Sequence, residues 1–239
     1  MFYMTVPRCV GCNERLTVEN VALCKRCLKA HTLLKERNCS RCAKKLNRCD
    51  CSNKYLKEHK VKKLIKIFRY IPDKEGTPSN NLIYSLKRNN RADVVRFLAD
   101  ELADAILNTL DSTDGFIITN VPRRGSAIRE YGYDHASVLA LAVAKRLNIE
   151  YRSLLRSKSK KAQKKMSHNE RKENAVFVCR KRTDLKGKRL LLLDDIVTTG
   201  SSMAASADAL KAMGAKQIVG VTVSIAFKDE YTPFKKTEF

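Results

Sequence analysis

Apolar runs alternate with stretches of helical periodicity from about residue 65 to residue 226. The uninterrupted run 190–193, four leucines, is typical of a strand that is buried on both faces, as in a parallel sheet. Shorter apolar or alternating runs predict further strands at 65–71, 115–121, 174–179 and 217–226. Apolar residues at helical spacing predict helices at 82–87, 92–110, 136–147 and 201–210. This alternation of strands and helices indicates an α/β fold.

The stretch that follows the four leucines combines acidic and hydroxyl side chains. Asp194 and Asp195 are expected to end the strand, and a short polar loop leads into the helix that starts at Ser201. Backbone N–H groups and the helix dipole make such a helix N-terminus a ready anion site. A glycine lets the backbone approach a ligand closely, and hydroxyls donate hydrogen bonds. The predicted anion-binding residues are Thr198, Thr199, Gly200, Ser201 and Ser202.

The two carboxylates restrict the kind of anion that can bind. They would repel a bare phosphate, whereas a ligand with a phosphate at one end and vicinal hydroxyls or a divalent metal at the other suits the whole motif. The stretch resembles the phosphoribosyl pyrophosphate (PRPP) signature of type I phosphoribosyltransferases. That resemblance implies that the loop holds the 5-phosphate and that Asp194 and Asp195 face the ribose hydroxyls. The alternative is a buried strand and a capped helix with solvated acids.

A second polar loop, 122–126, follows the predicted strand 115–121 and contains two adjacent arginines. Open α/β sheets bind their ligands at the carboxyl ends of the strands. We therefore predict that Arg123 and Arg124 bind a pyrophosphate group. An ordinary basic turn is the alternative.

Eight of the nine cysteines lie within the first 51 residues, mostly as pairs separated by two residues. Such pairs aim two thiolates at one tetrahedral ion, so we predict two structural zinc sites rather than disulfides. Sequential pairing is preferred, while interleaved pairing and an iron–sulfur cluster remain open. Lone Cys179 is expected to be a core residue. The predicted ligands are Cys9, Cys12, Cys24 and Cys27 for one ion, and Cys39, Cys42, Cys49 and Cys51 for the other.

The chain carries a net charge of +23 over 239 residues, which favours a nucleic acid partner and, second, a membrane surface. The segment 152–189 is the most basic, and its centre lacks apolar periodicity. A loop of this kind can close over a diphosphate, bind a nucleic acid backbone, do both, or be simply solvated. The predicted nucleic-acid contacts are Lys158, Lys160, Lys161, Lys164 and Lys165.

Two absences in the sequence bear on location. No run approaches the roughly 18 uninterrupted apolar residues of a membrane span. The first residues lack the basic and apolar regions of a signal peptide. We therefore expect a cytoplasmic protein without membrane insertion.

A cysteine-rich segment before a phosphoribosyltransferase-like domain resembles the ComF family of competence-associated proteins. The residues that carry this resemblance beyond the PRPP signature are 82–87, Val121, Pro122, Arg129, 132–134, Gln163, Ser167, Glu170, Arg171, Asn174 and Phe177. The resemblance implies a double zinc-ribbon module at 1–55 and a type I phosphoribosyltransferase-like domain at 56–239. One departure is that the basic loop is mostly lysine, where family members often carry proline or glycine.

The resemblance also implies a function. It suggests a PRPP-binding protein that handles single-stranded DNA during uptake in natural transformation, with proteins of the uptake machinery as possible partners. The alternative is an active phosphoribosyltransferase that transfers ribose 5-phosphate from PRPP to an unknown acceptor. In that case Mg²⁺ would bridge diphosphate and ribose, Arg123 and Arg124 would stabilise the leaving diphosphate, and Asp194 with Asp195 would fix the ribose.

Overall fold

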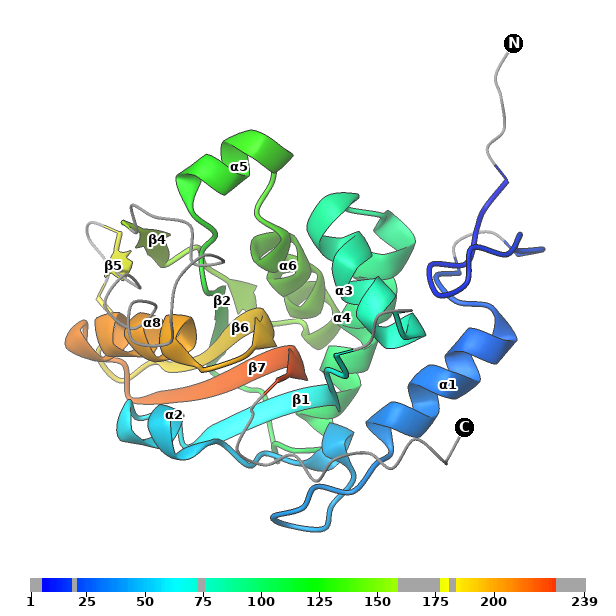
Figure 1. The fold of residues 1–239 in the computed structure, drawn as a ribbon. Helices are drawn as coiled ribbons and strands as arrows, with labels where there is room; N and C mark the ends of the chain where they lie inside the picture. The colour runs from blue at the N-terminus through cyan, green and yellow to red at the C-terminus, as the bar shows by residue number, and fades with distance from the viewer. Residues whose placement is uncertain (1–5, 19–20, 73–75, 159–176, 181–183, 227–239) are drawn as a thin grey trace.

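The computed structural model describes residues 6–18, 21–72, 76–158, 177–180 and 184–226. Its centre is a parallel sheet of five strands in the order β1-β7-β6-β2-β3 (Figure 1). The expected α/β architecture is therefore confirmed. The strands are β1 (Lys63–Arg69), β2 (Phe116–Asn120), β3 (Glu150–Tyr151), β6 (Arg189–Val197) and β7 (Gln217–Ile225).

The leucine run of β6 explains why this strand lies at the centre of the sheet. Successive residues of a strand point to opposite faces. Leu191 and Leu193 join one core with helices α4 and α6, while Leu190 and Leu192 join a second core with α8. Both faces of the sheet are thus covered by helices, as Figure 1 shows, and the strand has no polar face until it reaches the acids.

Four helices lie close to where the apolar periodicity predicts them, whereas the helices at 25–35, 54–58 and 125–131 were not predicted. None of them, within the described ranges, is long and apolar enough to cross a membrane. Their bounds are α1 (Lys25–Lys35), α2 (Lys54–Glu58), α3 (Pro78–Arg88), α4 (Ala92–Leu107), α5 (Gly125–Tyr131), α6 (His135–Leu147) and α8 (Ser201–Ala212), with a short 3-10 turn η1 (Leu46–Arg48).

Three local features differ from the sequence expectations. Strand β6 does not end at the acids but continues through them to Val197. Helix α3 begins earlier than expected because Thr77 caps it, its hydroxyl accepting a hydrogen bond from Asn80 N at 3.2 Å, with Pro78 in the first turn. The predicted strand at 174–179 is seen as β5 (Phe177–Cys179), which pairs antiparallel with β4 (Leu155–Ser157) outside the main sheet.

The cysteine-rich segment packs directly on the α/β part of the chain. Leu34 of α1 belongs to the same apolar core as Ile65 of β1. Asp50 O accepts a hydrogen bond from Leu64 N at 2.9 Å, and Cys51 forms an antiparallel bridge with Lys63, so residues around Cys51 cover the outer edge of β1. A division of the chain at residue 55 remains a prediction.

Candidate functional site

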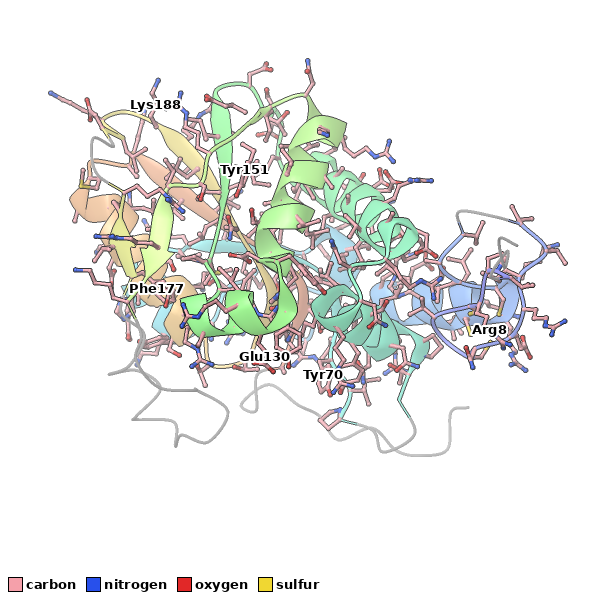
Figure 2. All side chains as sticks on the ribbon, turned by 90° about the horizontal axis from the view of Figure 1, so that it is seen from above. Arg8, Tyr70, Glu130, Tyr151, Phe177 and Lys188 are labelled. Atoms are coloured by element: carbon pink, nitrogen blue, oxygen red, sulfur yellow. The ribbon has the colours of Figure 1, made fainter. Side chains whose placement is uncertain are left out.

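The loops after β2 and β6 lie side by side at one edge of the sheet. Asn120 is paired with Leu193 in the parallel register, and Val121 N donates a hydrogen bond to Leu193 O at 2.8 Å. The loop with Arg123 therefore leaves the sheet next to the acids of β6. Figure 2 shows that Glu130 and Tyr70, which follow β2 and β1, lie at the opposite end of the molecule from Lys188, which precedes β6.

The acidic residue Asp195 is buried between two basic side chains. It is 5% exposed, and its Oδ2 lies 2.7 Å from Lys87 Nζ of α3 and 3.2 Å from His135 Nε2 of α6. The half-buried Asp194 alternates to the other face of β6, and its Oδ1 accepts a hydrogen bond from Asp195 N at 2.9 Å. The two predicted acids thus have different surroundings.

Sequence reasoning gave no role to Lys87 or His135. Lys87 closes the stretch 82–87, which also carries the resemblance to the ComF family, and His135 begins α6 directly after Asp134, the N-cap. The sequence did contain one signal for Lys87, because this lysine lies on the last turn of a predicted helix whose same face is otherwise apolar. Only the tertiary structure brings the side chains of Lys87 in α3 and His135 in α6 to Asp195.

The two carboxyl groups differ in pKa for physical reasons. Burial acts to raise the pKa of Asp195, but the charges of Lys87 and His135 outweigh it and hold that pKa below its usual range. Burial, followed by the neighbouring Asp195 carboxylate, raises the pKa of Asp194 well above its usual range. The negative charge of ionised Asp194 is therefore not balanced by neighbouring positive charges. A cation bound beside it would balance that charge.

We expect Asp194→Asn to stabilise the free protein increasingly as the pH rises from 5 to 7. The unfolded chain loses the Asp194 proton near pH 3.9, whereas the raised pKa delays that loss in the folded chain, so stability falls as the pH rises through this window. Asparagine cannot ionise and escapes this loss. Urea unfolding of both zinc-loaded proteins between pH 5 and 7 measures the difference. A difference that does not change with pH would contradict the assignment.

The loop 198–202 has the form expected of an anion-binding turn. Gly200 has φ +86° and is the N-cap of α8, where the first backbone N–H groups have no partner within the helix. Thr199 Oγ1 lies 2.8 Å from Ser201 Oγ and accepts from Ser201 N at 3.2 Å. Thr198 is exposed, and Ser202 is half-buried. The predicted hydroxyls are thus gathered around one helix N-terminus at the carboxyl edge.

Gly200→Ala should destabilise the protein by about 2–4 kcal/mol and weaken binding at the loop. The substitution forces an L-residue into the left-handed region, and its Cβ would lie 2.9 Å from Cγ of the buried Leu56. Gly187→Ala is the matched control, since Gly187 has φ +73° and open space around the Cβ position. It should cost only about 1 kcal/mol. Equal losses of unfolding free energy would show that Leu56 does not constrain the loop.

The arginine loop is held by contacts within the protein. Arg123 N donates to Asp134 Oδ2 at 2.9 Å, and the Arg123 guanidinium lies 4.3 Å from the centroid of the Tyr131 ring. Arg124 is half-buried and precedes α5. Both predicted arginines therefore lie in the loop that leaves β2 at the edge of the sheet where the acids of β6 lie, with Arg123 stacked on Tyr131 of α5. Their contact with a pyrophosphate remains a prediction.

The eight N-terminal cysteines form the two groups of the preferred pairing. In each group the four sulfur atoms lie within 4.8 Å of one another, and all nine cysteines are free thiols. Cys24 N donates to Cys9 Sγ at 3.2 Å; burial acts to raise the pKa of Cys9, but this and other backbone N–H groups lower it to about 7. Four cysteine sulfur atoms at these separations match the ligands of a tetrahedral zinc ion. The groups are Cys9, Cys12, Cys24, Cys27 and Cys39, Cys42, Cys49, Cys51.

The structure describes only the first residues of the basic loop. Lys158 is exposed just after β4, whereas Lys160, Lys161, Lys164, Lys165 and the pattern from Gln163 to Asn174 lie outside the described residues. Cys179 is half-buried against the core under α8, and its Sγ lies 3.3 Å from Ala209 O. Its packing agrees with the expected core role.

A family model matches the C-terminal part of the chain. Residues 134–238 match the phosphoribosyl transferase domain family. With the parallel order β1-β7-β6-β2-β3, this match gives the chain a type I phosphoribosyltransferase-like fold. Solved phosphoribosyltransferases are also similar. The purine enzyme of Pyrococcus horikoshii has 20% identity and a TM-score of 0.35 over 60% of this chain and 93% of that one. The hypoxanthine enzyme of Staphylococcus aureus has 13% identity and a TM-score of 0.38 over 61% and 70%.

The whole chain has more specific relatives. It is 24% identical over 223 residues to DNA utilization protein YhgH of Escherichia coli (strain K12), covering 90% of this chain and 96% of that protein. The Salmonella typhi protein of the same name is 25% identical over 225 residues, with the same coverage. Together with the two four-cysteine groups, this similarity over nearly the full length confirms the resemblance to ComF-type proteins.

Proposed function

We propose that the protein binds a ribose 5-phosphate group, as PRPP with Mg²⁺, at the carboxyl edge of its sheet. We further propose that this binding serves the handling of single-stranded DNA during uptake into the cytoplasm. The observation that carries the first part is the placement of the acids of β6 next to the hydroxyl-rich N-terminus of α8. A sugar that bears a terminal phosphate matches this order of groups.

Different residues of the proposed site suit different groups of PRPP. The loop 198–202 suits the 5-phosphate through its hydroxyls and backbone N–H groups. Asp194, whose charge is poorly compensated, suits the ribose hydroxyls and a nearby Mg²⁺. Mg²⁺, when bound, would supply positive charge to the diphosphate. Arg124, beside this edge, is suited to the same group.

The DNA part of the proposal rests on two observations. The relatives that span the chain are named DNA utilization proteins. The net charge of +23 favours a polyanionic partner, and the exposed Lys158 begins the basic loop beside β4. Phosphate contacts of this kind bind with little regard to base sequence.

Titration calorimetry tests the sugar-phosphate site. We expect PRPP with Mg²⁺ to bind, and Thr198→Ala and Asp194→Asn each to weaken it by about tenfold, the effect of losing about 1.4 kcal/mol. Thr198 is exposed, so its replacement leaves the fold intact. Inorganic pyrophosphate is the matched ligand without the ribose. Absence of heat with PRPP and Mg²⁺, from a protein that retains its zinc, would refute this part.

Fluorescence anisotropy with a labelled single strand tests the DNA part. Affinity should fall steeply with salt, with a slope of about −0.7 per neutralised phosphate in the logarithmic plot. Glutamine at Lys158, Lys160, Lys161, Lys164 and Lys165 together should flatten that slope. The same substitutions should leave PRPP binding unchanged if the loop serves DNA alone. Unchanged DNA affinity in this variant would assign DNA binding to another surface.

The domain match also favours a catalytic candidate, transfer of ribose 5-phosphate to an acceptor. Isotope exchange between PRPP and labelled pyrophosphate, across nucleobases and amines, distinguishes it from binding alone. Exchange that Asp194→Ala and Asp195→Ala abolish would establish an enzyme. PRPP binding without exchange would support the binding protein.

A further inference from the structure

A lysine is buried in the middle of the strand β1. Lys66 is 1% exposed and stands among the largest fully buried side chains of the described residues. Its Nζ donates to Cys51 O at 2.7 Å and to Leu64 O at 3.2 Å. Burying an ammonium group costs several kcal/mol unless an opposite charge compensates it. Two carbonyl oxygens satisfy hydrogen bonds but bring no full charge.

No carboxylate of the described residues forms an ion pair with Lys66. Asp50, close to it along the chain, pairs instead with Lys63 at 3.2 Å. The ammonium lies instead against two members of the second cysteine group, Cys49 and Cys51. Cys51 supplies the carbonyl, and the side chain of Cys49, which faces Lys66, is fully buried.

We propose that Lys66 is the counter-charge of the second metal site, formed by Cys39, Cys42, Cys49 and Cys51. Four thiolates around one divalent ion carry a net charge of −2, which more than offsets the +1 charge of a buried ammonium. The sheet therefore needs this site in its metal-bound form, since neutral thiols would leave Lys66 uncompensated. The requirement is independent of any sugar phosphate at the other site.

Among the described residues, the first cysteine group has no such partner, since Lys66 is the only buried lysine or arginine that they contain. The basic side chains next to these cysteines are exposed; Arg26, for example, is 73% exposed and pairs with Glu14 at 3.0 Å. The group attaches to helices instead, through hydrogen bonds from Asn81 to Gly11 O and from Arg91 to Arg8 O. The second group attaches to β1, whose outer edge it covers. The two metals therefore have different structural roles.

Native mass spectrometry of the full zinc-loaded chain, titrated with a chelator, tests the proposal. Lys66→Met should release one of the two zinc ions at about 10–100-fold lower chelator concentration, the usual cost of losing a partner of a metal ligand. The other ion should be retained as in the wild type. Arg26→Met, at the first group, is the control and should shift neither ion by more than about twofold, because its charge is exposed.

A second measurement separates compensation of charge from simple packing. Without zinc, Lys66→Met should be at least as stable to urea as the wild type, because the uncompensated ammonium is gone; with zinc, it should be less stable. Should Lys66→Met fail to fold with zinc, Lys66→Gln, which keeps a donor but no charge, gives the same comparison. Unchanged zinc retention, or a loss of stability in the zinc-free variant, would overturn the proposal.

Discussion

Asp195→Asn should lower the free energy of unfolding by about 3 kcal/mol and strongly weaken the binding of PRPP. The substitution leaves Lys87 and His135 facing a neutral amide in a buried position, and breaking a buried pair on one side typically costs 3–5 kcal/mol. Lys87 is one-third exposed, so part of its charge is solvated and the lower end is expected. Urea unfolding and calorimetry with PRPP and Mg²⁺ measure the two effects.

The double variant Asp195→Asn with Lys87→Met separates these effects. Removing both partners should recover part of the unfolding free energy, whereas PRPP binding should stay weak because the carboxylate is still missing. Strictly additive losses in the two single variants and the double variant would show that Asp195 and Lys87 do not interact in solution.

Removing zinc from the whole chain should lower the thermal midpoint by at least about 10 °C, with recovery when zinc is added back. Structural zinc contributes about 10–16 kcal/mol of binding free energy per site in zinc-finger peptides, which is comparable to the net stability of a whole domain. For a chain of this size, about 1 kcal/mol corresponds to 2–4 °C. Differential scanning calorimetry before and after exhaustive chelation measures the shift. An unchanged midpoint in protein shown to be free of zinc would contradict a structural role.

Cys12→Ser and Cys42→Ser are matched variants for this experiment. Both cysteines are half-buried, and each belongs to one group. Each variant should lose one zinc ion, but Cys42→Ser should cause the larger fall in the midpoint, because its group covers the edge of β1 and compensates Lys66. A larger fall for Cys12→Ser would reverse the roles of the two groups.

Helix α3 connects the first cysteine group with the acidic pair. In its first turn Asn81 donates to Gly11 O at 3.0 Å, and in its last turn Lys87 holds Asp195. The cysteine-rich segment thus contributes to the position of a residue at the candidate site. This connection gives a structural reason for joining a metal-binding segment to a phosphoribosyltransferase-like fold.

The sequence by itself determined the main elements of this protein. Four consecutive leucines predict a strand buried on both faces, because only a sheet covered on both sides can use apolar residues at every position. The paired cysteines predicted two metal groups, since close spacing along the chain brings thiolates together whatever the rest of the fold does. The hydroxyl-rich loop was also predictable, because its residues are consecutive in the sequence.

Only the tertiary structure decided what surrounds the charged residues. Lys87, His135 and Asp195 lie far apart in the sequence and meet because α3 and α6 pack on the end of β6. In the sequence, Lys66 is one polar position of an alternating strand, which is typical of an exposed side chain. In the structure it is buried, because the second cysteine group covers β1. Local patterns reveal which face of an element is apolar, but the charge that compensates a buried group comes from whichever distant segment packs against it.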